Sequence, residues 1–137
     1  MRVLLTVLLC ALMLSSVSFG QTDAEKAATE AANHWLSVVD AGSYAASWQA
    51  AAPAFKIAVL KDQWAQMLQA NRAPLGRVIS RTLKSATYKT SLPGAPDGKY
   101  VVIQYESSFE HKQSAIETIT PSLGDDGQWR VSGYFIR

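Results

Sequence analysis

The fold class of this chain is clearest in residues 100–136, which read YVVIQYESSFEHKQSAIETITPSLGDDGQWRVSGYFI. Val, Ile, Thr and aromatic residues alternate along it with polar ones, which is typical of strands that bury one face. EHK at 110–112 predicts a tight hairpin, and GDDG at 124–127 supplies the Asp-Gly chemistry of a second turn. Together with a similar run before it, the pattern predicts an antiparallel meander of four strands, at 77–91, 99–109, 113–123 and 128–136.

The residues before these strands have helical spacing instead. Apolar side chains recur at three- and four-residue intervals over 23–41, which predicts a helix that Gly42 terminates. A short second helix carries Tyr44 and Trp48 on one face. Residues 53–73 are also helical, and the pattern leaves open whether they form one helix or two. Helices first and strands afterwards predict an α+β domain in which the N-terminal helices pack on one face of the sheet.

Strand alternation also assigns side chains to the two faces of the sheet, on the assumption that even-length hairpin loops pair residues of opposite parity. One face is apolar and is predicted to form the core: Val101, Ile103, Tyr105, Ile116, Thr118, Trp129, Val131 and Phe135. The other is mixed and is predicted to be solvated or to form a subunit interface: Val102, Gln104, Glu106, Ala115, Glu117, Ile119, Arg130, Tyr134 and Ile136. Pro121 implies a nearby bulge or strand end, and a bulge would flip the residues beyond it.

Two carboxylates are the most tempting catalytic feature of the strands. Under the assumed register, Glu106 and Glu117 lie on the same face of adjacent strands, where a pair could do acid–base chemistry. That face points away from the helices, and Arg130 and Lys84 would neutralise both groups as cross-strand partners. We therefore favour a structural role for the two glutamates.

Aromatic side chains crowd the helical half of the chain: Trp35, Tyr44, Trp48, Phe55 and Trp64. Each aromatic residue buries a large area, and a small domain without disulfides needs that burial. Core packing is therefore favoured over a ligand-binding wall. For a ligand pocket, we expect the lining to be Trp35, Tyr44, Trp48 and Tyr105.

The first twenty residues have the pattern of a secretory signal peptide. Arg2 precedes an apolar run of about a dozen residues, and small residues follow at Ser18 and Gly20. Its removal would leave one α+β domain over 21–137, periplasmic or secreted, and a retained membrane anchor is the alternative. Cys10 lies within the apolar run after Leu9, a context that argues against a lipid anchor.

The composition of the mature chain excludes several classes of function. Because Arg2 leaves with the signal peptide, 12 basic residues face 11 acidic ones, and a net charge of +1 gives no footprint for nucleic acid or an anionic membrane. Without Cys10, the only cysteine, the chain has no disulfide, thiol nucleophile or thiolate metal site. We therefore expect no cofactor, no metal and, after signal cleavage, no membrane attachment.

The remaining polar candidates are weaker. His34 lies at the margin of the buried helical stripe, and His111 lies in a predicted hairpin tip, so the two histidines predict no zinc site. Arg77 and Arg81 form a small basic pair on one strand that could hold an anionic ligand, although a solvated sheet edge is the favoured interpretation. The chain lacks the GxSxG, Walker, GxGxxG and HExxH motifs.

Three stretches carry a resemblance to a known family: ANHWLSVVDAGSYAASWQAAAPAFK, RAPLGRVISRTLKSATYKTSLPGAPDGKYVVIQYESSF and the terminal WRVSGYFIR. The chain resembles the bacterial family catalogued as domain of unknown function 4019 over about residues 31–137. That family is uncharacterised, so the resemblance implies no activity. Its order of elements is similar to the NTF2-like cone, in which a curved sheet wraps a helix and forms a pocket. This fold hosts enzymes, binding modules and dimerisation domains alike.

Three functions remain open at this point. The leading hypothesis is an exported, non-catalytic binding or interaction domain of a Gram-negative periplasm that takes a small apolar ligand or an envelope protein, with a homodimer contact around Tyr134 and Ile136. The alternative is an NTF2-like isomerase or hydrolase that draws an acid or base from Asp40, His34 or, with a flipped register, Glu117. The third is a purely structural partner of another envelope protein.

Overall fold

The computed structural model describes residues 21–137. The predicted signal peptide, with Cys10, lies outside the described residues.

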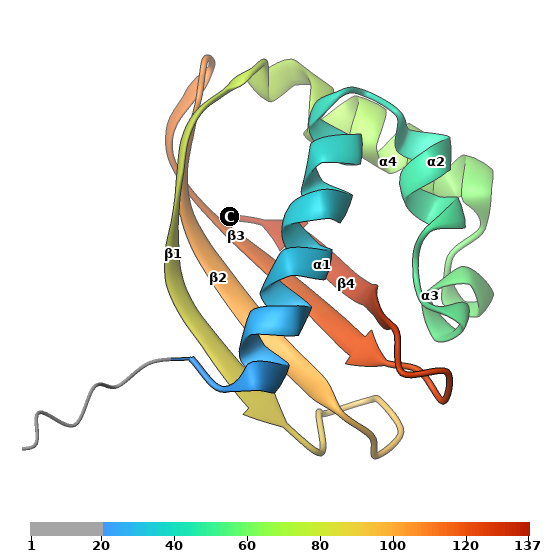
Figure 1. Ribbon diagram of the computed structural model, residues 1–137. Coiled ribbons are helices and arrows are strands. Elements are labelled where there is room, and N and C mark those ends of the chain that lie inside the picture. The colour runs from blue at the N-terminus through green and yellow to red at the C-terminus, as the bar shows by residue number, and fades with distance from the viewer. Residues whose placement is uncertain (1–20) are drawn as a thin grey trace, which may run out of the picture.

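A four-stranded antiparallel sheet in the order β1-β2-β3-β4 forms one layer of the fold. Its strands are β1 (Val78–Lys89), β2 (Tyr100–Phe109), β3 (Lys112–Leu123) and β4 (Trp129–Ile136). The sheet is curved, and α1 (Asp23–Asp40) crosses its concave side (Figure 1). The predicted α+β architecture and the strand meander are thereby confirmed.

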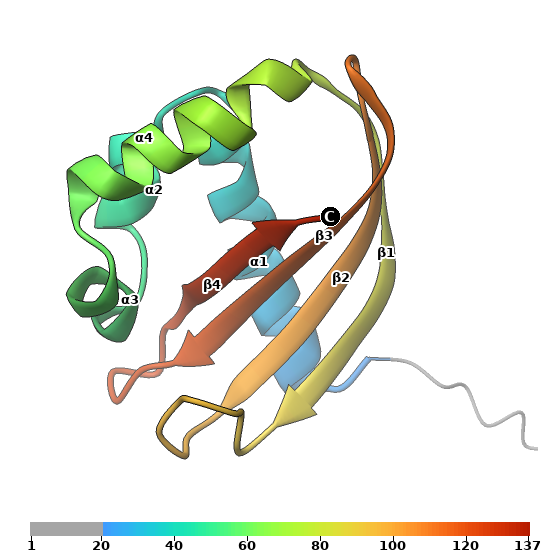
Figure 2. The same ribbon diagram turned by 180° about the vertical axis from the view of Figure 1, so that it is seen from behind.

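Three shorter helices form a second group on the same side of the sheet, beyond β4 (Figure 2). They are α2 (Tyr44–Gln49), α3 (Pro53–Ala58) and α4 (Lys61–Asn71), and the 3-10 turn η1 (Ala73–Leu75) leads from α4 into β1. Residues 53–73, for which the sequence left open one helix or two, therefore form two helices. Val59 separates them because its backbone is extended, with φ −131° and ψ 125°.

The ends of α1 follow from local chemistry. Thr22 and Glu25 form a capping box, in which each side chain accepts a hydrogen bond from the backbone N–H of the other residue, both at 3.2 Å. Gly42 has a φ of 77°, which reverses the chain and lets Ser43 N–H bond the carbonyl of Val38 at 3.1 Å. Gly42 is thus the predicted stop, and it aims the chain into α2.

The core lies between α1, α4 and the concave side of the sheet. Its buried members come from every layer: Ala28, Ala32, Trp35, Leu36, Val39, Ala51, Phe55, Trp64, Leu68, Val101, Ile103, Tyr105, Ile119 and Val131. Trp35, Phe55, Trp64 and Tyr134 form an aromatic cluster within it. Their ring centroids lie 4.8 Å apart for Phe55 and Trp64, 5.3 Å for Trp35 and Tyr134, and 6.2 Å for Trp35 and Trp64.

A β-bulge next to the β2–β3 turn places the side chains of β3 on faces of the sheet opposite to those predicted. Phe109 pairs with Lys112, in the assumed register, but Ser107 pairs with Ala115. Between these two pairs β3 carries one residue more than β2, and this extra residue exchanges the two faces of β3 relative to the prediction. Glu117 is consequently brought to the concave side, where its side chain is completely buried.

A second bulge lies at Pro121, as its missing backbone donor predicts. Thr120 pairs with Gly133 and Pro121 with Val131, so β4 holds the extra residue, Ser132. Together the two bulges bring five residues assigned to the mixed face onto the concave side: Ala115, Glu117, Ile119, Tyr134 and Ile136. Three residues assigned to the core lie on the convex side instead: Ile116, Thr118 and Phe135.

The corrected register changes two further predictions. Glu106 pairs with Ile116 on the convex side, so Glu106 and Glu117 lie on opposite faces of the sheet and form no carboxylate pair. Tyr134 and Ile136 face the helices, so a homodimer contact through the outer face of the sheet does not use their side chains. The homodimer itself stays a prediction.

Candidate functional site

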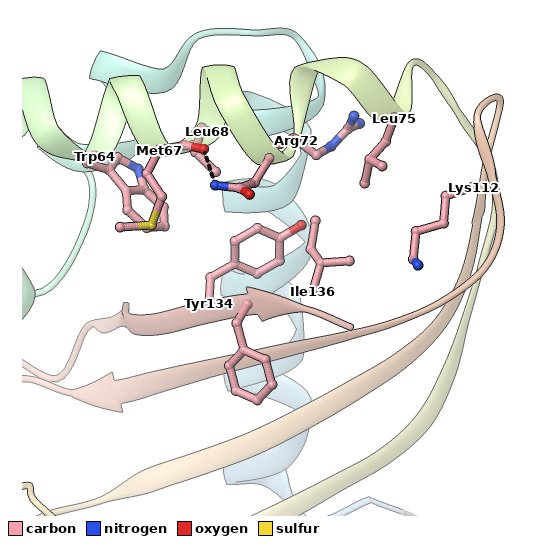
Figure 3. Close-up of a pocket in the computed structure, with 10 residues that line it drawn as sticks. Trp64, Met67, Leu68, Arg72, Leu75, Lys112, Tyr134 and Ile136 are labelled. Carbon is pink, nitrogen blue, oxygen red and sulfur yellow. Dashed lines mark hydrogen bonds between the residues drawn. The ribbon is translucent and has the colours of Figure 1, made fainter.

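A pocket of about 300 Å³ lies between α4, β4 and the tip of the β2–β3 hairpin (Figure 3). Its apolar lining is Trp64, Met67, Leu68, Leu75, Tyr134, Phe135 and Ile136, and its polar lining is Asn71, Arg72 and Lys112. Ligand sites are commonly concave and mostly apolar, with a few placed polar groups. This pocket is therefore the candidate functional site.

The two walls of the pocket come from different parts of the chain. Trp64, Leu68 and Arg72 follow one another at four-residue intervals and so lie on one face of α4 and its C-cap. Tyr134 and Ile136 project from β4 toward this helix (Figure 3). The bulge at Pro121 creates the second wall, because without it the side chains of β4 beyond the bulge would face the convex side.

Four charged residues form an ionic chain beside the pocket: Arg72, Asp40, Arg81 and Glu117. Arg81 pairs with Asp40 through Nη1 and Oδ2 at 2.8 Å and with Glu117 through Nε and Oε1 at 2.7 Å. Arg72 reaches the other oxygen of Asp40 at 3.2 Å. Two cations and two anions alternate along the chain, so it is neutral as a unit.

Glu117 accepts four hydrogen bonds, although its side chain is completely buried. Arg81 donates through Nε at 2.7 Å and through Nη2 at 3.1 Å. Ser107 donates through Oγ at 2.5 Å, and the Tyr134 hydroxyl donates to the second carboxylate oxygen. A carboxylate offers about four lone-pair positions. Glu117 therefore has no position left at which to take a proton from a ligand.

The Tyr134 hydroxyl connects the pocket with Glu117. Burial, followed by the nearby negative charge of Glu117 and the hydrogen bond to it, raises the pKa of Tyr134 well above its ordinary value. Burial likewise raises the pKa of Tyr105, whose hydroxyl donates to Asn33 Oδ1 at 2.5 Å. Both phenols hold their protons at neutral pH, so each is a hydrogen-bond donor rather than a base.

The two cations of the pocket differ in how they are held. Arg72 stacks on Phe109 at 4.6 Å and donates to the Gly76 carbonyl at 2.6 Å, but its buried Nε has no hydrogen-bond partner. Lys112 is half-buried and lies within 4.0 Å of no carboxylate among residues 21–137. One cation of the pocket is thus neutralised and the other is free.

The four aromatic residues predicted to line a pocket lie elsewhere. Trp35 donates to the Ser47 carbonyl at 2.8 Å and Trp48 to the Val59 carbonyl at 2.7 Å, while Tyr44 packs against the core. Trp35 also lines a smaller pocket, of about 110 Å³, and Tyr105 is buried with its hydroxyl on Asn33. The structure does not bring the four together around one cavity, and ligand binding by them stays a prediction.

The residues of the enzyme alternative are brought together in part. Asp40 and Glu117 meet on Arg81, whereas His34 is exposed and lines the smaller pocket with Trp35. Arg81 is not part of a solvated basic pair, because its side chain is only 15% exposed. Arg77 is 86% exposed and pairs with Glu110 at 3.0 Å.

The partners predicted for the glutamates also differ. Arg130 pairs with Asp126 at 2.7 Å, and Lys84 is exposed. Sequence reasoning missed Arg72 and Lys112 as site residues. The spacing of Trp64, Leu68 and Arg72 could have indicated Arg72.

In the part of the chain that the structure describes, no group of three or more His, Cys, Asp or Glu residues could hold a metal ion. No helix within residues 21–137 is long and apolar enough to cross a membrane.

The comparison with protein families finds a match over residues 31–134, to the family described as "Protein of unknown function (DUF4019)". This match covers most of the chain, from within α1 to Tyr134 in β4. The chain belongs to this family. The comparison with curated proteins finds no match.

Proposed function

We propose that this protein is a small exported binding domain, similar in architecture to the NTF2-like cone, that holds a ligand without transforming it. The signal-peptide pattern supports export to the periplasm or beyond. The pocket between α4 and β4 supports binding, because it is mostly apolar and large enough for a small molecule.

The environment of Glu117 is the observation that supports binding without catalysis. A general base needs a free lone pair within hydrogen-bond reach of the proton it abstracts. All four positions of Glu117 are occupied, and Asp40 accepts from both Arg72 and Arg81. The remaining polar groups of the pocket are Asn71, Arg72, Lys112 and the Tyr134 hydroxyl, which are suited to orienting a ligand.

One observation favours an enzyme as the second candidate. Tyr134 lines the pocket and donates to Glu117, so a ligand that displaced this hydroxyl would expose a buried carboxylate. In that case Glu117 would act as the base and Tyr134 as the gate to it. The proposal therefore has to be tested by ligand recovery as well as by binding.

A fragment library screened by two-dimensional NMR tests the proposal. We expect compounds that shift the resonances of Trp64 and Ile136 and that are recovered chemically unchanged, by mass spectrometry, after hours with the protein. Met67→Trp places an indole at the pocket mouth, where Met67 is 47% exposed, and is expected to block binding. Gln66→Trp, one residue earlier on the exposed side of α4, is the matched control and is expected to bind normally.

Two outcomes would overturn the proposal. Absence of any fragment bound at this pocket removes the binding function. Conversion of a bound compound, lost in Glu117→Gln while the fold is kept, replaces it with the enzyme.

A further inference from the structure

We infer that the pocket takes a small amphiphile with a single negative charge, such as an alkyl or aryl carboxylate, with its acidic group near Lys112 and its apolar body against Trp64. This inference rests on the proposed binding function and names the chemical class of its ligand.

The sign of the charge follows from the ion pairs around the pocket. Arg72 and Arg81 are balanced by Asp40 and Glu117. Glu110, beside Lys112 at the hairpin tip, is taken by Arg77 at 3.0 Å. The remaining charge on the pocket wall is that of Lys112, which contributes one unit of positive charge. A half-buried ammonium is stabilised by a ligand of opposite charge, and a neutral or cationic ligand would leave it unpaired.

The pocket is also polarised along its length. Trp64, Met67 and Leu68 lie toward one end, while Arg72, Leu75 and Lys112 lie toward the other (Figure 3). The hairpin tip is tied to η1 by the backbone bond from His111 N–H to the Leu75 carbonyl at 2.9 Å, which keeps Lys112 beside this end. One end is therefore apolar and the other cationic.

Hydrogen-bond capacity supports the same orientation. Lys112 has three N–H donors and Arg72 an unpartnered Nε–H, whereas the carboxylates nearest the pocket are occupied by arginine and hydroxyl donors. The cationic end is thus rich in donors. A carboxylate, which only accepts hydrogen bonds when ionised, matches this surplus.

The size of the pocket limits the ligand. About 300 Å³ lies at the lower end of the range of small-molecule sites, which is roughly 300–1,000 Å³. A medium-chain fatty acid or a bicyclic aromatic acid is of this order, whereas a whole phospholipid is much larger.

Calorimetry with octanoate, 1-octanol and octylammonium at low salt tests the inference. We expect octanoate to bind about tenfold more tightly than 1-octanol, which corresponds to about 1.4 kcal/mol, and octylammonium to bind most weakly. Lys112→Met keeps a long apolar stem without the charge, and is expected to reduce octanoate affinity to that of 1-octanol while leaving 1-octanol affinity unchanged. Lys84→Met, at an exposed position on β1, is the matched control and is expected to bind all three as the natural chain does.

The outcomes separate this inference from the function on which it rests. Equal affinity for octanoate and 1-octanol, both blocked by Met67→Trp, overturns the anionic ligand and leaves the binding domain intact. An unchanged octanoate affinity in Lys112→Met overturns the role of Lys112, and Lys112→Gln serves as a second variant if the first does not fold. Binding by neither probe overturns the inference, and the fragment screen then decides the proposed function independently.

Discussion

The aromatic cluster and the ionic chain are held in different ways, although both lie on the concave side of the same sheet. Trp35, Phe55 and Trp64 contribute to stability through the apolar area that they bury, and this contribution depends little on the direction of each contact. Glu117 is stabilised only while every one of its donors is in place, because a buried charge without a partner is strongly destabilising. The pocket lies where the two regions meet, so it takes an apolar wall from one and charge from the other.

Removal of Glu117 is expected to have the largest effect. Glu117→Ala leaves Arg81 with one partner fewer in a buried setting, and we expect a loss of about 3–5 kcal/mol in the free energy of unfolding. Joint replacement by Arg81→Met and Glu117→Leu removes both charges and is expected to recover most of that loss. Urea denaturation at pH 7 measures both. If the double variant were no more stable than Glu117→Ala, the unpaired charge of Arg81 would not be the cause of the loss. The ionic chain would then be stabilised by buried area, as the aromatic cluster is.

The second largest effect is expected at alkaline pH, where stability is lost through Tyr134, which donates to the ionic chain at Glu117. The pKa of Tyr134 is raised in the folded protein, so above the ordinary tyrosine pKa of 10 the unfolded chain releases a proton that the folded chain keeps. Stability is therefore fully present below pH 10 and falls above it, by up to about 1.4 kcal/mol per pH unit from this group.

Tyr134→Phe is expected to flatten this alkaline decline, measured by urea titrations between pH 9 and 11.5. Tyr88→Phe, on an exposed part of β1, is the matched control and is expected to keep the original slope. Identical slopes in the two variants would remove the link between Tyr134 and the buried charge.

The smallest effect is expected at an exposed ion pair. The Arg130 guanidinium hydrogen-bonds the Asp126 carboxylate and lowers the pKa of that carboxyl to about 2. Arg130→Gln is expected to raise the pKa of Asp126 toward its ordinary 3.8, as read from NMR titration of the carboxyl carbon. Stability linked to this pair is present above pH 3.8 and is lost only as pH falls toward 2.

The urea midpoint of Arg130→Gln at pH 7 is accordingly expected to stay unchanged, because water screens exposed pairs. A shift of the urea midpoint as large as that of Glu117→Ala would show that exposed and buried charges contribute equally to the stability of this protein.

The helices and strands could be predicted because their signals are local. Gly42 ends α1, Pro53 begins α3 and the Asp-Gly turn at 126–127 separates β3 from β4, each by the chemistry of a single residue or pair. The order of helices and strands then indicated the α+β class without any knowledge of tertiary contacts.

The candidate site could not be predicted in the same way, because it depends on register. The bulge between Lys112 and Ala115 contains neither Gly nor Pro, so the sequence carries no signal that predicts it. It exchanges the faces of β3 and thereby brings Glu117 inside. Arg81 becomes its partner across 36 residues of sequence, a pairing that only the folded sheet creates.

The extra residue of β3 has a consequence for how this chain can vary in length. Deleting Ser114 would remove the bulge and leave Ser107 opposite Ala115, so Glu117 would stay on the concave side, whereas one residue lost between Ala115 and Glu117 would turn Glu117 to the other face. The exposed connection over 91–98 carries no such constraint. Relatives of this protein should therefore differ freely in the size of that loop and in the presence of the extra residue beside the hairpin, while the stretch of β3 from Ala115 to Glu117 keeps a fixed count of residues.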